Sequence, residues 1–159
     1  MMLDHRYADF AWEQAAALLA VDSPSGFTAN AAQWVKTAFN NLGCPASLTR
    51  KGGVIADLGG TDREDALLLE AHADTLGAMV CRIKANGRLQ LTPLGGMNAN
   101  NSEAENVKIY TRNGSVYEGT AQLADASIHV NSSYNDTKRS FDTLEVVLDE
   151  TVASADDTQ

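Results

Sequence analysis

The stretch Leu67-Leu68-Leu69-Glu70-Ala71-His72-Ala73-Asp74 decides how the rest of the chain is interpreted. It opens as a continuous apolar run and closes on a His-x-Asp pair. Such a run is typical of a β-strand that is buried on both faces of an α/β sheet. Ligands of open α/β sheets bind beyond the carboxyl ends of the strands. The stretch therefore predicts an α/β fold with a ligand site at His72 and Asp74.

The residues before this run supply the other elements that an α/β domain needs. Apolar residues recur at helical spacing over 6–21 and again over 28–42, so both segments are predicted to be helices. The cluster 22–26, which contains Pro24, cannot continue a helix and separates the two. Two short strands, 46–50 and 53–58, are predicted to follow. Residues 1–75 are thus expected to form the start of an α/β domain.

The residues after the run have the texture of an all-β domain. Two Asn-Gly dipeptides predict hairpins with type I′ turns: strands 79–84 and 88–93 flank Asn86-Gly87, and strands 106–112 and 115–121 flank Asn113-Gly114. A last strand is predicted over 144–149. Short strands at this spacing are typical of a small barrel or sandwich. Ser154 and the acidic residues after it are typical of a helix start.

Composition and charge narrow the classes of function. The 159 residues hold 12 Lys+Arg against 21 Asp+Glu, which gives a formal net charge of −9. This charge argues against binding to nucleic acid or to an anionic membrane, because both require a basic face. We find no signal peptide and no run of 18 apolar residues, so the predicted location is the cytoplasm. The two cysteines, Cys44 and Cys81, cannot form a disulfide framework or a Cys-rich zinc site.

His72 and Asp74 are the strongest candidates for chemistry. Residues two apart on an extended segment point to the same side, so the two side chains can share one cleft. A neutral imidazole can bind a transition metal, and a carboxylate on its other ring nitrogen fixes the tautomer. Four other candidates are weaker: a solvated His5, a loop His129, a core Cys81, and a Glu70 that pairs or faces a loop.

The run 67–80 also resembles the first metal-binding motif of the glutamyl-aminopeptidase and tetrahedral-aminopeptidase family of dinuclear metallopeptidases, some of which are labelled endoglucanases. The resemblance extends to four further segments, in order along the chain: 22–26, 51–56, 94–96 and 126–129. It departs from the family at Thr75, where many members carry a glutamate. Glycosidase chemistry fits least, because it requires two opposed carboxylates across a cleft.

The resemblance implies a mixed-sheet zinc-peptidase-like domain whose N-terminal part is 1–75. It implies an inserted, barrel-like β-domain at 76–148, followed by the start of the return to the catalytic domain at 149–159. The family holds two divalent metal ions, zinc or cobalt, and cleaves N-terminal residues from peptides. His72 would be a metal ligand, and Asp74 would be the catalytic-site residue that orients it.

The remaining family ligands follow the β-domain and have no counterpart in this sequence. The resemblance therefore implies an N-terminal fragment of an aminopeptidase that is inactive alone. Two alternatives stay open. The β-domain is an interaction module that forms homo-oligomers, or a second chain completes a split enzyme.

Overall fold

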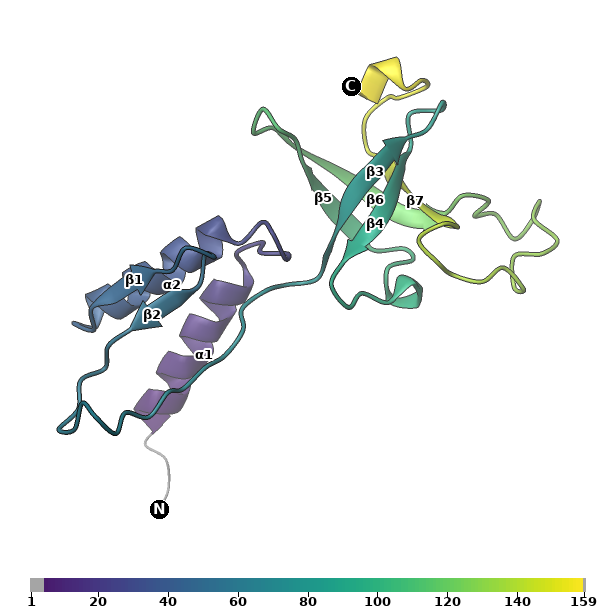
Figure 1. The fold of residues 1–159 in the computed structure, drawn as a ribbon. Helices are drawn as coiled ribbons and strands as arrows, with labels where there is room; N and C mark the ends of the chain where they lie inside the picture. The colour runs from purple at the N-terminus through teal and green to yellow at the C-terminus, as the bar shows by residue number, and fades with distance from the viewer. Residues whose placement is uncertain (1–4, 159) are drawn as a thin grey trace. The chain divides into compact units, whose positions relative to one another are not determined.

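The computed structural model describes residues 5–158, and the chain divides into two compact units, Met1–Gly77 and Ala78–Gln159 (Figure 1). The first unit contains two helices and a two-stranded hairpin, and the second contains a five-stranded antiparallel sheet. The expectation of a mixed α and β protein is therefore confirmed. No helix within residues 5–158 is long and apolar enough to cross a membrane.

The helices of the first unit lie where the sequence predicts them. Helix α1 spans His5–Leu19 and helix α2 spans Ala29–Asn41. Beyond α2, Gly43 has a φ of +78°, a left-handed conformation that glycine adopts without steric cost, and its N–H donates to the carbonyl of Asn40. Thr28 occupies the N-cap position, although its side chain makes no capping hydrogen bond there.

Strands β1 (Ala46–Leu48) and β2 (Val54–Ala56) form the predicted hairpin of the first unit and pair with each other in an antiparallel register. The run 66–72, in contrast, is not a strand. Leu67, Leu68 and Leu69 are 85%, 78% and 75% exposed. A strand buried on both faces needs neighbouring strands and covering layers, and among the described residues the sheet of this unit ends with β1 and β2.

The second unit is built on one open sheet with the strand order β3-β4-β7-β6-β5. Its strands are β3 (Gly77–Ile83), β4 (Leu89–Leu94), β5 (Asn106–Tyr110), β6 (Val116–Leu123) and β7 (Leu144–Leu148). The order is linear, with β3 and β5 at the edges, so the predicted barrel-like closure is not confirmed. One apolar core joins Leu89, Ala121 and Val146, and a second joins Ala99, Leu123 and Leu144.

The two hairpins of this unit differ from the prediction in their turn type. A type I′ turn requires positive φ at both central residues, but Asn86 and Asn113 do not have it. Each turn instead has three loop residues and ends in a left-handed glycine, Gly87 or Gly114. The N–H of Gly87 donates to the carbonyl of Lys84 at 2.8 Å. The extra residue makes this a type I turn with a bulge, so β3 ends one residue and β5 two residues before the predicted ends.

The chain end folds onto the first of these turns. A short 3₁₀ helix, η2 (Asp156–Thr158), replaces the predicted α-helix start. Ser154 is not the capping acceptor, because its N–H and its hydroxyl both donate to the Asp157 carboxylate at 2.9 Å. The hydroxyl of Thr158 donates to the carbonyl of Gly87 at 2.9 Å. The acidic end of the chain is therefore part of the second unit.

Candidate functional site

The side chains of His72 and Asp74 meet, as their spacing predicts. Nδ1 of His72 lies 2.8 Å from Oδ1 of Asp74, and the two side chains are 89% and 45% exposed. This hydrogen bond lowers the pKa of the Asp74 carboxyl, so the carboxylate is ionised and can only accept. Nδ1 therefore carries the proton of a neutral imidazole. The lone pair of Nε2 is then left for a ligand.

The backbone around Asp74 is fixed by Ser23, which comes from the turn between α1 and α2. The Ser23 hydroxyl donates to the carbonyl of Ala73 at 2.8 Å. The Ser23 N–H donates to Oγ1 of Thr75 at 3.0 Å, and the N–H of Thr75 donates back to the Ser23 carbonyl at 3.0 Å. Asp74 thus lies between two residues that are both tied to Ser23.

Two further contacts hold the same turn against the same segment. The Ser25 hydroxyl lies 3.4 Å from Oδ2 of Asp74, the carboxylate oxygen that His72 does not use. Pro24 packs against Gly77 so closely that a Cβ at Gly77 would overlap the proline ring. The Ser-Pro-Ser-Gly turn, which the sequence analysis identifies as a helix breaker and as part of the family resemblance, is therefore the support of the His72–Asp74 pair.

The described residues do not form a metal site on their own. Within 5–158 no group of three or more His, Cys, Asp or Glu side chains is arranged to hold a metal ion. Glu70, His129 and Cys81 are all exposed. The prediction that Cys81 is a core residue is wrong, because β3 is an edge strand. His72 is thus one potential ligand.

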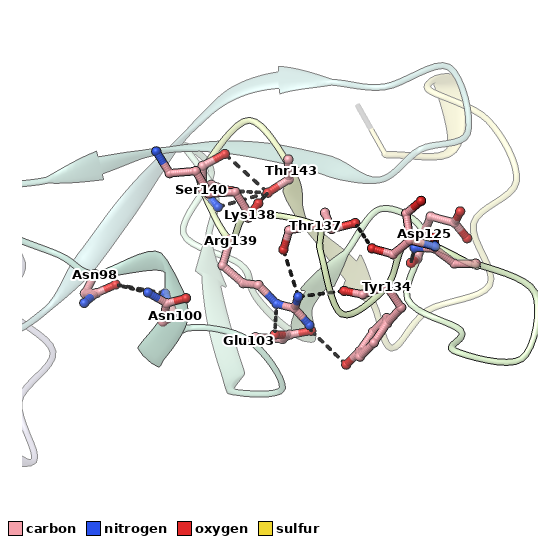
Figure 2. A network of polar contacts seen from close by, with 12 residues as sticks. Asn98, Asn100, Glu103, Asp125, Tyr134, Thr137, Lys138, Arg139, Ser140 and Thr143 are labelled. Carbon is pink, nitrogen blue, oxygen red and sulfur yellow. Dashed lines mark hydrogen bonds and ion pairs between the residues drawn. The ribbon is translucent and has the colours of Figure 1, made fainter.

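A polar network in the second unit was not predicted from the sequence (Figure 2). Arg139 donates from Nε to Glu103 at 2.7 Å and from Nη1 to the carbonyls of Tyr134 and Thr137. The guanidinium also lies 4.7 Å from the centre of the Tyr134 ring. The Arg139 bond lowers the pKa of Glu103. This network holds the irregular segment 124–143, which carries His129. Glu103 is 36 residues away from Arg139, too far along the chain for the pairing to be predicted from sequence.

A second network surrounds Glu145, whose carboxylate is almost fully buried in β7. Nζ of Lys84 donates to Oε2 at 2.6 Å, and Arg88 donates to Oε1. Burial alone would raise the pKa of Glu145, but the hydrogen bonds from Lys84 and Arg88 outweigh it and lower the pKa. The sequence shows Glu145 only as one charge in an acidic stretch. The pairing across the sheet makes it a core residue.

The sequence and the fold can now be compared with known proteins. The sequence pattern of the M42 glutamyl aminopeptidase family matches residues 52–159, so the chain belongs to this family. It is 36% identical over 142 residues to YhfE of Bacillus subtilis (strain 168), whose name marks it as a candidate aminopeptidase. That alignment covers 89% of this chain and 41% of YhfE, so the chain spans about two fifths of its relative's length.

Solved structures show the same fold. A TET aminopeptidase from a marine sediment archaeon of the Thaumarchaeota matches 96% of this chain with a TM-score of 0.80 at 20% identity. The Pyrococcus horikoshii TET1 peptidase, described as assembling into a tetrahedron or a large octahedral shell, matches 92% with a TM-score of 0.73 at 17% identity. The chain covers 41% and 42% of these two structures.

Proposed function

We propose that the chain is the N-terminal part of a metal-dependent aminopeptidase that hydrolyses N-terminal residues from peptides. The observation that carries the proposal is the His72–Asp74 pair, in which the carboxylate fixes the proton on Nδ1 and leaves Nε2 for a metal ion. Membership of the M42 glutamyl aminopeptidase family supports it. The proposed arrangement places the α/β part at 1–75, the inserted β-domain at 76–148 and the return to the catalytic domain at 149–159.

In this proposal His72 is a ligand of a divalent ion, zinc or cobalt, and Asp74 orients the imidazole. The exposed imidazole fits this role, because its open nitrogen meets no steric barrier from a buried environment. A bound metal would supply Lewis acidity and an activated water. The residues of this chain do the rest: Asp74 holds the proton on Nδ1, and Ser23 fixes the backbone on both sides of Asp74.

The chain alone is proposed to bind metal weakly and to lack peptidase activity. A catalytic zinc site needs about three protein ligands and one open position, and residues 5–158 provide no such group. The test is a zinc titration together with aminoacyl-p-nitroanilide turnover on the purified chain, with His72→Gln as the control. Weak binding that His72→Gln abolishes supports the proposal. Robust turnover by the chain alone refutes its inactivity.

A second candidate function is that of one half of a split enzyme. Its support is the exposure of Leu67, Leu68 and Leu69, an apolar run that has no strand partner among the described residues of the first unit. A second polypeptide with the missing ligands could cover this run by strand addition. Mixing the chain with the C-terminal three fifths of YhfE and measuring turnover tests the idea. Activity only in the mixture, lost with Leu68→Asp, supports it.

The second unit is also proposed to mediate homo-oligomers. Its edge strand β3 exposes Met79 and Val80, and an exposed apolar edge is a template for pairing with another chain. The shells of the related TET1 peptidase make this a reasonable role. Light scattering after size exclusion measures it. We expect Val80→Lys to shift oligomers to monomers, and a monomer at high concentration in the unmodified chain refutes the proposal. The proposed location is the cytoplasm.

A further inference from the structure

We propose that Thr75 and Ser23 are positioning residues that set the tautomer of His72 and thereby its affinity for a metal ion. The inference rests on the proposed function in one respect, that His72 binds a metal. The inference goes beyond the proposed function, because it assigns roles to two residues that touch neither the metal nor the substrate. It also gives a purpose to Thr75, the residue at which the chain departs from the motif it resembles.

The first argument is the symmetry of the hydrogen bonds around Asp74. Ser23 is bonded to the residue before Asp74 through its hydroxyl, at 2.8 Å from the Ala73 carbonyl. It is bonded to the residue after Asp74 through both its N–H and its carbonyl, each at 3.0 Å from Thr75. These three bonds fix the peptide planes on the two sides of the Asp74 Cα. The direction of the Asp74 side chain is then set.

The second argument is that no regular secondary structure holds residues 66–74 in place of these hydrogen bonds. Residues 66–74 belong to no helix or strand, and both His72 and Asp74 are exposed. An exposed pair on an unpaired segment would otherwise lose its geometry to chain entropy. Ser23, in contrast, is only 1% exposed, so its bonds are shielded from water. The buried serine is therefore the anchor, and the exposed pair is what it holds in place.

The third argument concerns the side chain of Thr75. Its Oγ1 is bonded directly to Cβ, so the hydroxyl stays close to the backbone and accepts from the N–H of Ser23. Because the Ser23 N–H donates to Thr75, it does not compete with His72 for the Asp74 carboxylate. The remaining carboxylate oxygen faces the Ser25 hydroxyl. The two oxygens of Asp74 thus have separate partners, His72 for Oδ1 and Ser25 for Oδ2.

The experiment compares four substitutions in the purified chain. Thr75→Val removes the acceptor while keeping the shape, and Thr75→Ser keeps the acceptor. Thr28→Val in the same unit is the matched control, because the Thr28 side chain makes no capping hydrogen bond. The first measurement is the ¹⁵N spectrum of the histidine side chains without metal at about pH 8.5, where ordinary histidines are neutral. His72→Gln identifies the His72 signals. The second is Co²⁺ affinity from the visible spectrum.

We expect Thr75→Val to shift His72 from the Nδ1–H tautomer to a mixture, and to weaken Co²⁺ binding by roughly tenfold, the lower end for loss of a group that supports a ligand. Thr75→Ser should restore both, and Thr28→Val should change neither. An unchanged tautomer in a folded Thr75→Val chain overturns the inference, whatever the metal result. If the unmodified chain binds no Co²⁺ but the tautomer shifts, positioning stands and the ligand role of His72 fails.

Discussion

The Lys84→Met substitution tests whether the Glu145 network stabilises the second unit. Lys84 is about a quarter exposed and donates at 2.6 Å to a carboxylate that is 2% exposed. A hydrogen bond to a charged group contributes about 1.5–3 kcal/mol, whereas an exposed ion pair contributes about 0–1 kcal/mol. Methionine keeps the apolar stem of lysine. Arg88 continues to bond the other oxygen. We therefore expect a loss of about 2 kcal/mol.

The assay can separate the two units because of where the tryptophans lie. Both Trp12 and Trp34 belong to the first unit, so tryptophan fluorescence in urea reports on that unit alone. Hydrogen exchange of β4, β6 and β7, pulsed at each urea concentration, reports on the second. The exposed Arg112, in the other hairpin turn, gives a matched loss of charge as Arg112→Met.

The expected result is specific to one unit and one residue. Lys84→Met should lower the free energy of unfolding of the second unit by about 2 kcal/mol, equal to about 8–16 °C in melting temperature for a unit of this size. Tryptophan fluorescence should be unchanged. A loss below about 0.5 kcal/mol, or one that Arg112→Met matches, refutes the view that a buried pair is at work here.

Three further predictions concern the same unit. The pKa values of Glu145 and Glu103 are lowered in the folded state. The stability that each contributes is therefore complete above the ordinary glutamate pKa of about 4.3 and is lost as the pH falls through the folded pKa. Circular dichroism at stepped pH should show unfolding below about pH 4, and a midpoint of acid unfolding that Glu103→Gln together with Lys84→Met leaves unchanged contradicts this. Arg139→Lys loses the paired contacts to Glu103 and the carbonyl bonds, so limited proteolysis should cut within 124–143 at least about tenfold faster, whereas Lys138→Arg, its neighbour, should leave the rate unchanged. Gly87→Ala places a Cβ at a φ of +78° and against Val152 and the chain end, so urea unfolding should show a free energy of unfolding lower by about 1–3 kcal/mol. Gly96→Ala is the control, because the added Cβ meets nothing within 4 Å there.

The local elements could be predicted from sequence because their signals are local. Helical spacing located α1 and α2, and Gly43 marked the end of α2 where its φ is positive. The Asn-Gly dipeptides located two hairpins, but not the turn type, because the third loop residue leaves no distinct signal. The His72–Asp74 contact could be predicted because residues two apart on an extended segment share a side.

The contacts between distant residues could not be predicted in this way. Glu145 reads as a surface charge until β4 and β7 are paired, and only the fold brings Lys84 to it. Ser23 reads as part of a helix-breaking turn until it meets Thr75. The run 66–72 was predicted to be a strand from its own composition, but a central strand depends on neighbours that the described unit does not contain.

The exposed leucines at 67–69 have a consequence for biosynthesis. Ribosomes add roughly 5–20 residues per second and the N-terminal unit emerges first, so about 5–20 seconds pass between the emergence of this run and that of Gln159. During that interval three adjacent leucines are available to any hydrophobic surface in the cell. Within the described part of this unit, full burial is reached at Ala31 and Ser23. The nascent chain therefore carries an exposed apolar segment throughout this interval, which makes it prone to aggregation before the rest of the chain is made.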